Sequence, residues 1–383
     1  MRREPALSGS NEPGLRERLR QPFAVAATIG ALSLAGAAGS ANKTAALEGF
    51  GYADTDIMLT EPEAAQKAVD RDIQAGANTI LITQPITIGE DVFDRDPSRL
   101  CMAVNLADKN DFRIVIRNEG HFENGEFGMV PITDEEREHY VKAEANMVST
   151  IKKCAPGLKT VYISPINEPN YVLFNKRQYD ARGNWTAPRD VALTYSYIYP
   201  RLHAAAEQTG IDAEIIGGDL DQHSQELFFK RTEQFLKLGL ISTKLFDIYA
   251  AHFYVQKVSP QVITLAQNNI DYITNMVKTV YGNVPIWYTE LGGISTVPAA
   301  KANLYTKLPK SIVPMSEGLQ GQFYIEFDNY AACLGVEDVI VWHSKDDGGP
   351  MRTALTRPDD SRKRGYEPVV AAVKTNKYNC STS

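Results

Sequence analysis

Two glutamates could carry acid–base chemistry, and each follows a short apolar segment. Glu168 comes just after the apolar run 161–166, and Glu290 directly follows the run 284–289. Two carboxyl groups that face each other across a bond can hydrolyse an acetal. One protonates the leaving oxygen, while the other attacks the sugar carbon or activates water. This pair is therefore the first candidate for an active site.

Both apolar runs belong to a series of strand-like segments that alternate with helix-like segments. Continuous apolar runs are typical of parallel strands that are buried on both faces. Eight such strands predict an α/β fold, the (β/α)8 TIM barrel, in which strand-end residues gather over one mouth. The expected strands are 47–52, 79–83, 112–117, 161–166, 214–218, 246–253, 284–289 and 338–342.

The alternative fold is an open doubly wound sheet. That fold carries a glycine-rich phosphate turn after its first strand, and the sequence at 49–52, Gly-Phe-Gly-Tyr, is a poor version of one. We therefore predict a single barrel domain over residues 45–378, followed by a C-terminal tail at 379–383. The loops after strands 4 and 7 are expected to be enlarged. Aromatic residues in the first, at 171–187, could stack on sugars or pack the loop onto the barrel rim.

The composition favours a soluble globular protein that acts on an uncharged or weakly charged partner. The chain has 383 residues, 43% hydrophobic and 23% charged residues, and a formal charge of −7. This charge argues against a general nucleic-acid or anionic-membrane binder. No cluster of lysine and arginine that could follow a phosphate backbone occurs in the expected barrel.

The N-terminus has the features of a targeting segment. Arg16, Arg18 and Arg20 precede an apolar run rich in small residues, Phe23–Ala41. Within it, Ala-Gly-Ala at 35–37 resembles a signal-peptidase site. Residues 1–41 are thus expected to be a signal peptide, with a disordered tail or a membrane anchor as alternatives. We expect a secreted or cell-surface protein with no further membrane segment.

The four cysteines are compatible with either redox compartment. Cys333 and Cys380 are both expected on the underside of the barrel, so an exported protein could link them by a disulfide. Cys101 and Cys154 are expected near opposite ends of neighbouring helices, which argues against a bridge between them. No C-x-x-C motif or His/Cys cluster indicates a zinc site.

The motifs together resemble clan A of the retaining glycoside hydrolases. Asn-Glu-Pro after a fourth strand and Thr-Glu at the end of a seventh are similar to family 5 and family 39-like enzymes, and to exported actinobacterial cellulase-family proteins. The resemblance spans about residues 45–378. It implies that Glu168 is the general acid/base and Glu290 the nucleophile, with no metal or organic cofactor. The implied substrate is a β-linked oligo- or polysaccharide or glycoside.

The resemblance also implies sugar-binding residues at other strand ends. Asn167 would bind the sugar 2-hydroxyl, Trp342 would form the floor of the cleaved subsite, and Tyr254 would hold the nucleophile. His252 stands two residues before Tyr254, so both face the same side of a strand. Each of these residues could instead have a purely structural role. Asn167 could be a turn residue, Trp342 could pack in the core, and His252 and Tyr254 could be hydrogen-bonded polar residues of the barrel interior. The predicted substrate-binding residues are Asn118, His121, Asn167, His252, Tyr254 and Trp342.

One position departs from the family pattern. Many family 5 enzymes have an arginine in the second strand that supports the nucleophile, and Leu81 stands there in this chain. Arg113 or Arg117 on the next strand could supply that charge. Glu119 adds a third strand-end carboxylate, and Asp219 could line the mouth or support a loop.

The missing arginine motivates a second hypothesis, a carbohydrate-binding barrel with impaired catalysis. A third hypothesis is a metal-dependent hydrolase of the same fold. The scattered histidines and the lack of clustered His/Asp ligands at the strand ends argue against it.

Overall fold

The computed structural model describes the compact unit from Thr44 to Cys380, together with Lys43. The expected targeting segment at 1–41 lies outside the described residues, and the loops expected after strands 4 and 7 lie partly outside them. The internal positions outside the description are 55, 59–60, 92, 94–96, 122–129, 172–174, 178–180, 184–185, 222–244, 256–259, 297–299, 302–313 and 349–351.

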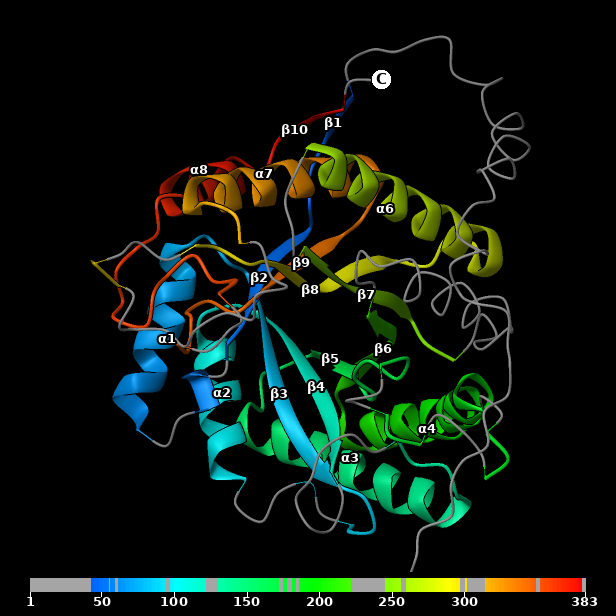
Figure 1. Cartoon of the computed structure of the whole chain (residues 1–383). Coiled ribbons are helices and arrows are strands. Elements are labelled where there is room, and N and C mark those ends of the chain that lie inside the picture. Colours follow the sequence, from blue (N-terminus) through cyan, green and yellow to red (C-terminus); the bar gives the residue numbers. More distant parts are fainter. Residues whose placement is uncertain are drawn as a thin grey trace, which may run out of the picture. The chain divides into compact units, whose positions relative to one another are not determined.

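Eight parallel strands close into a barrel, as predicted (Figure 1). Neighbours in the barrel follow chain order, and the last strand pairs with the first to close it. The predicted strands were shorter at several ends than those in the structure. The barrel strands are β2 (Gly49–Ala53), β3 (Thr79–Thr87), β4 (Arg113–His121), β5 (Thr160–Ser164), β6 (Asp212–Asp221), β7 (Ile248–Val255), β8 (Ile286–Gly293) and β9 (Asp338–Trp342).

Helices surround the ring of strands and cover its outer face (Figure 1). No helix in the described part of the chain has the length and apolar character needed to cross a lipid bilayer. The described α-helices are α1 (Pro62–Gln74), α2 (Ser98–Lys109), α3 (Asp134–Cys154), α4 (Ala187–Thr209), α6 (Pro260–Tyr281), α7 (Glu317–Cys333) and α8 (Tyr366–Thr375).

Local sequence signals set the ends of the helices. At the start of α3, the Thr133 side chain accepts a hydrogen bond from the Glu136 backbone, and the Glu136 side chain accepts one from the Thr133 backbone. This capping box satisfies donors that the first helical turn leaves free. At the end of α4, Gly210 adopts a φ of +71°, a left-handed conformation that glycine accepts at low cost.

Side-chain alternation along the strands separates the core inside the barrel from the core outside it. On β4, Val115 packs inside the barrel with Leu81 and Trp287, whereas Ile114 and Ile116 face the helices. Because the side-chain period of a strand is two, the next inward position is residue 117. Thus the alternation that builds the core also carries Arg117 into the barrel mouth.

Two disulfides link elements that lie outside the ring of strands. Cys333, at the end of α7, is linked to Cys380 in β10 (Tyr378–Cys380), which pairs with β1 (Lys43–Ala45); this is the bridge the sequence allowed. Cys101 is linked to Cys154, with Cα atoms 5.2 Å apart, so the expectation that these two cysteines stay apart was wrong. Helix α2 is so short that Cys101 lies only about 12 Å from its C-terminal end. The last turn of α3 lies beside this part of α2, where Asn105, one turn after Cys101, donates a hydrogen bond to the Cys154 carbonyl at 3.0 Å.

Candidate active site

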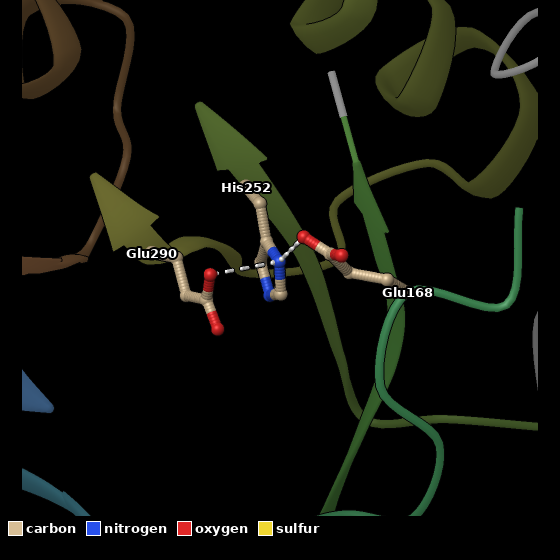
Figure 2. Close-up of side chains that lie close together, drawn as sticks. All are labelled: Glu168, His252 and Glu290. Atoms are coloured by element: carbon tan, nitrogen blue, oxygen red, sulfur yellow. Dashed lines mark hydrogen bonds and ion pairs between the residues drawn. The ribbon is translucent and has the colours of Figure 1, made fainter. Parts of the chain in front are cut away.

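The two glutamates meet at the mouth of the barrel (Figure 2). Glu168 lies in the loop just after β5, and Glu290 lies within β8. Their side chains are buried, and one carboxylate oxygen of each lies within 4.8 Å of the other. Glu168 has a φ of +39°, and its backbone N–H donates to the Asp219 carbonyl at 3.1 Å. That hydrogen bond supports a backbone conformation that is uncommon for glutamate.

His252 lies between the two carboxylates, as Figure 2 shows. Its Nδ1 atom is 2.8 Å from Glu168 Oε1 and 3.3 Å from Glu290 Oε2. On the other side of the ring, Nε2 is 3.4 Å from Asp219 Oδ1. Burial alone would lower the pKa of His252, but the Asp219 and Glu168 carboxylates raise it to about 8. The contacts with these carboxylates therefore favour the imidazolium form of His252.

Arg117 supplies the positive charge that the second strand of the barrel lacks. Its Nη1 is ion-paired with Glu290 Oε1, and its Nη2 donates to Thr83 Oγ1 at 2.8 Å. The Tyr254 hydroxyl donates to the other carboxylate oxygen, Glu290 Oε2. A cation and a phenol donor both favour the ionised form of a carboxyl group. The other candidate, Arg113, is paired instead with Asp338 at the N-terminal ends of the strands.

Asp219 lies beneath His252 and is the residue whose importance the sequence did not reveal. Its carboxylate accepts hydrogen bonds from Ser164 on β5 and Thr289 on β8, and its side chain is fully buried. Burial would raise the pKa of Asp219, but the contacts with His252, Ser164 and Thr289 hold it below its usual value. The only sequence signal was its position after the fifth strand-like segment.

Two further predicted residues border the carboxylates. The centre of the half-buried Trp342 ring lies 4.5 Å from the guanidinium carbon of Arg117. The peptide bond between Trp342 and His343 is cis. Burial lowers the pKa of His343 to about 4, so that ring is neutral at pH 7. Asn167 is buried, and its Oδ1 accepts no hydrogen bond from the described part of the chain. Buried polar atoms normally have partners, so this oxygen suits a ligand hydroxyl.

No protein-family model matches the sequence, and no curated protein is significantly similar to it. Solved structures do match. The barrel fold is shared with clan A glycoside hydrolases. A GH5_18 protein from Streptomyces cattleya, solved in complex with GlcNAc, has a TM-score of 0.57 at 14% identity, over 86% of this chain and 80% of that one.

Two further clan A structures match a smaller share of their own length. The exo-β-1,4-mannosidase Op5Man5 from Opitutaceae bacterium strain TAV5 has a TM-score of 0.56 at 14% identity, over 86% of this chain and 60% of that one. The Faecalibacterium prausnitzii β-glucuronidase has a TM-score of 0.56 at 16% identity, over 88% and 50%. This chain thus spans about half the length of that β-glucuronidase. At such identities the likeness establishes the barrel fold, while the chemistry has to be argued from the site.

The structure does not bring Asn118 to this site. Asn118 follows Arg117 on β4 and therefore faces the opposite side of the strand, where it donates to Glu144 on α3 at 2.8 Å. The prediction treated position 118 as a loop residue, but β4 continues to His121 and keeps its alternation. Glu119 and His121 share the inward face with Arg117, and Glu119 Oε1 is 3.5 Å from Arg117 Nη2.

The same side chains could offer ligands to a metal ion. Glu168, His252 and Glu290 each present one ligand atom, all within 4.8 Å of one another. A cation there would compete with Arg117 and with the protonated His252 for the same carboxylates. We therefore assign no metal to this group of residues.

Proposed function

We propose that the protein is a retaining O-glycoside hydrolase that uses Glu168 as the general acid/base and Glu290 as the nucleophile. The observation that carries this proposal is the meeting of two buried carboxylates, with oxygens within 4.8 Å, in a barrel mouth. Retaining enzymes hold their two carboxyl groups about 5–5.5 Å apart, whereas inverting enzymes leave about 6.5–9.5 Å for a water molecule. The short separation favours retention.

The first step forms a glycosyl-enzyme ester. Glu168 donates its proton to the glycosidic oxygen while a carboxylate oxygen of Glu290 attacks the anomeric carbon, and the bond to the leaving group breaks. Arg117 and Tyr254 each hold one oxygen of Glu290, so the nucleophile is kept ionised and oriented before the substrate arrives.

The second step releases the sugar. Glu168, now a carboxylate, takes a proton from water as the water attacks the anomeric carbon and the bond to Glu290 breaks. The two inversions at the same carbon give net retention. Both steps use the same two glutamates, so no cofactor is required.

The proposed substrate is a β-linked oligo- or polysaccharide or glycoside. The oxygen of Asn167, which accepts no hydrogen bond from the described residues, suits a sugar hydroxyl, and the half-buried ring of Trp342 suits the apolar face of a sugar. The names of the similar structures, which include a β-glucuronidase and an exo-β-1,4-mannosidase, support the β linkage.

The hypothesis of a binding-only barrel rested on the missing arginine of the second strand. Arg117 reaches the nucleophile from the neighbouring strand, which removes that reason. The metal-dependent alternative predicts that a chelator abolishes turnover, whereas the two-glutamate mechanism predicts unchanged turnover in the presence of EDTA.

Covalent trapping tests the proposal directly. The protein is incubated with a panel of 2-deoxy-2-fluoro β-glycosides bearing good leaving groups, and the labelled peptide is mapped by mass spectrometry. We expect one label per molecule, on Glu290, and none in Glu290→Gln. Glu119→Gln is the matched control, since Glu119 is a third carboxylate of the same mouth, and it should still be labelled on Glu290. A label on Glu119, or turnover that continues in Glu290→Gln, would overturn the assignment.

We propose, separately, that the protein is exported and acts outside the cytoplasm. The targeting features at residues 1–41 motivate this proposal, and the two disulfides support it because such bonds persist mainly in oxidising compartments. N-terminal sequencing of protein from the culture medium tests it. A start near residue 38 is expected, whereas retention of the full N-terminus inside the cell would contradict export.

A further inference from the structure

Asp219 occupies a position that ordinary strand alternation would not give it. Ile216, on β6, packs inside the barrel, whereas Leu220 packs outside with the helices. The pairing of β6 with β7 shifts register between Gly218 and Leu220, and Asp219 has a φ of +40°. This bulge turns Asp219 into the barrel directly below the site.

A second bulge lies on β8, where it places Thr289 beside Asp219. Ala251 is paired with Tyr288, but the next residue, His252, is paired with Glu290, so Thr289 is the extra residue. Both Thr289 and Glu290 therefore face the interior, Thr289 toward Asp219 and Glu290 toward Arg117. A bulge of this kind re-aims side chains next to it.

The Asp219 contacts reach the immediate surroundings of both glutamates. Its backbone carbonyl accepts from the Glu168 N–H at 3.1 Å, and its carboxylate accepts from Thr289, the residue before Glu290. A third bond, from Ser164, ties it to the strand that precedes the Glu168 loop. One buried side chain thus connects β5, β6 and β8 under the reacting groups.

The charges around His252 give Asp219 a second effect. Three carboxylates face the imidazole, from Glu168, Asp219 and Glu290, and Tyr254 and Arg117 both engage Glu290. Arg117 offsets the charge of Glu290, and Glu168 is uncharged when it carries the acidic proton, so in the acid form of the site Asp219 is the counter-charge of His252. In keeping with this pairing, the pKa of His252 is raised and that of Asp219 is lowered.

We propose that Asp219 is a positioning residue that keeps His252 doubly protonated and aimed at Glu168. In that state Nδ1–H donates to Glu168 Oε1, and Nε2 carries the second proton beside the Asp219 carboxylate, 3.4 Å away and paired with it by charge rather than by a hydrogen bond. Since Oε1 then acts as an acceptor, the acidic proton of Glu168 is placed on Oε2, the oxygen that would meet the glycosidic oxygen in the proposed mechanism. The catalytic consequence rests on the proposed function, whereas the coupling between Asp219 and His252 does not.

Histidine titration by NMR tests this coupling without any substrate. In the wild type, the ¹⁵N shifts of His252, assigned with His252→Gln, should show both ring nitrogens protonated at pH 7. In Asp219→Asn, which keeps the shape and tolerates the left-handed backbone, the pKa of His252 should fall by about one unit or more. Thr289→Val is the matched control: it removes one hydrogen bond to Asp219, keeps the charge, and should leave the titration within a few tenths of a unit.

Two results would overturn the proposal. The first is a wild-type His252 that is neutral at pH 7, which can be judged even if Asp219→Asn does not fold. The second is an unchanged His252 titration in a folded Asp219→Asn. Turnover is measured alongside, with a methyl and a dinitrophenyl β-glycoside, and Asp219→Asn should slow the methyl glycoside by about tenfold more because that substrate depends on acid catalysis. If no glycoside is cleaved but His252 shifts, the proposed function fails and the coupling stands.

Discussion

Arg117 on β4 is ion-paired with Glu290 on β8, across the interior of the barrel. The guanidinium is fully buried and is also fixed by Thr83 and by the Trp342 ring. The resemblance to family 5 enzymes led us to expect this charge on the preceding strand, β3. Inward side chains of neighbouring barrel strands point into the same space. An arginine on either strand can therefore pair with the nucleophile.

Removing Arg117 should impair both stability and turnover. Arg117→Leu leaves Glu290 as a buried charge without its cation, which is expected to lower the free energy of unfolding by about 3–5 kcal/mol. Arg117→Lys keeps the positive charge but loses the planar set of N–H donors of the guanidinium, so kcat should fall by about tenfold. In Arg117→Leu, which loses the charge as well, kcat should fall by more than that. Urea denaturation and initial rates on an aryl β-glycoside measure the two effects.

The control for Arg117 is Arg113→Leu, since both arginines are on β4 and pair with a buried acid. Arg113→Leu should also be destabilised, with kcat per folded molecule within about twofold of wild type. Equal losses of kcat in the two variants would show that the Arg117 effect is only structural.

Glu168→Ala should show a dependence on the leaving group. Without the acid, a methyl β-glycoside should be cleaved about 10²–10⁴-fold more slowly, whereas a dinitrophenyl β-glycoside should lose much less in the first step. Azide can take the vacated space and attack the glycosyl-enzyme ester, giving a β-glycosyl azide that NMR identifies. Glu119→Ala serves as the comparison and should yield only the sugar; an azide adduct from Glu119→Ala instead would reassign the acid.

Substitution of Asn167 should impair catalysis, whereas substitution of Asn118 should impair stability, because Asn167 borders the site and Asn118 faces the helices outside the barrel. Asn167→Ala is expected to lower kcat/KM by about 10²-fold or more, through the lost contact with a sugar hydroxyl in the transition state. Asn118→Ala should leave kcat/KM within about twofold. It should cost about 1–3 kcal/mol in the free energy of unfolding, because Glu144 loses its buried hydrogen-bond donor. A large loss of kcat/KM in Asn118→Ala would show that the side chain reaches the substrate after all.

Stability should fall with rising pH because of Glu144. Burial raises its pKa to about 8, although the Asn118 hydrogen bond opposes the rise. Between about pH 4.5 and 8 the folded protein therefore holds a proton that the unfolded chain has released, so unfolding becomes more favourable as pH increases. The contribution is at most about 5 kcal/mol over that window.

Glu144→Gln tests the origin of this pH dependence. The glutamine keeps an acceptor for Asn118 but cannot ionise, so urea midpoints measured at pH 5, 6.5 and 8 should change less than in the wild type. A residual slope is expected from Asp72 and Asp328, whose pKa values burial also raises. Identical pH dependence in the variant and the wild type would exclude Glu144 as a contributor.

Much of the fold and the centre of the site could be read from local patterns. Continuous apolar runs indicated all eight barrel strands, because a parallel strand that is buried on both faces is apolar along its whole length. Glu168 and Glu290 were recognisable as site candidates because residues that follow the carboxyl end of a barrel strand lie at the barrel mouth. The resemblance to clan A enzymes singled out His252 and Tyr254, and their spacing of two placed both on the same face of a strand.

Other features depend on distances between elements, which no local pattern contains. Asn118 was misplaced because the end of β4 was predicted too early, and one strand position decides which side of the wall a residue faces. Cys101 and Cys154 were separated in the prediction because it assigned them to opposite helix ends without the true helix lengths. The pairing of those helices brings the two cysteines together.

The sequence by itself determined that eight strands alternate with helices and that two glutamates end the fourth and seventh of them, since both follow from periodicity along the chain. Only the tertiary structure decided that Arg117 serves Glu290 and that Asp219 lies under His252. The bulges at Asp219 and Thr289 break the period of two, and register between strands arises from packing around the whole barrel.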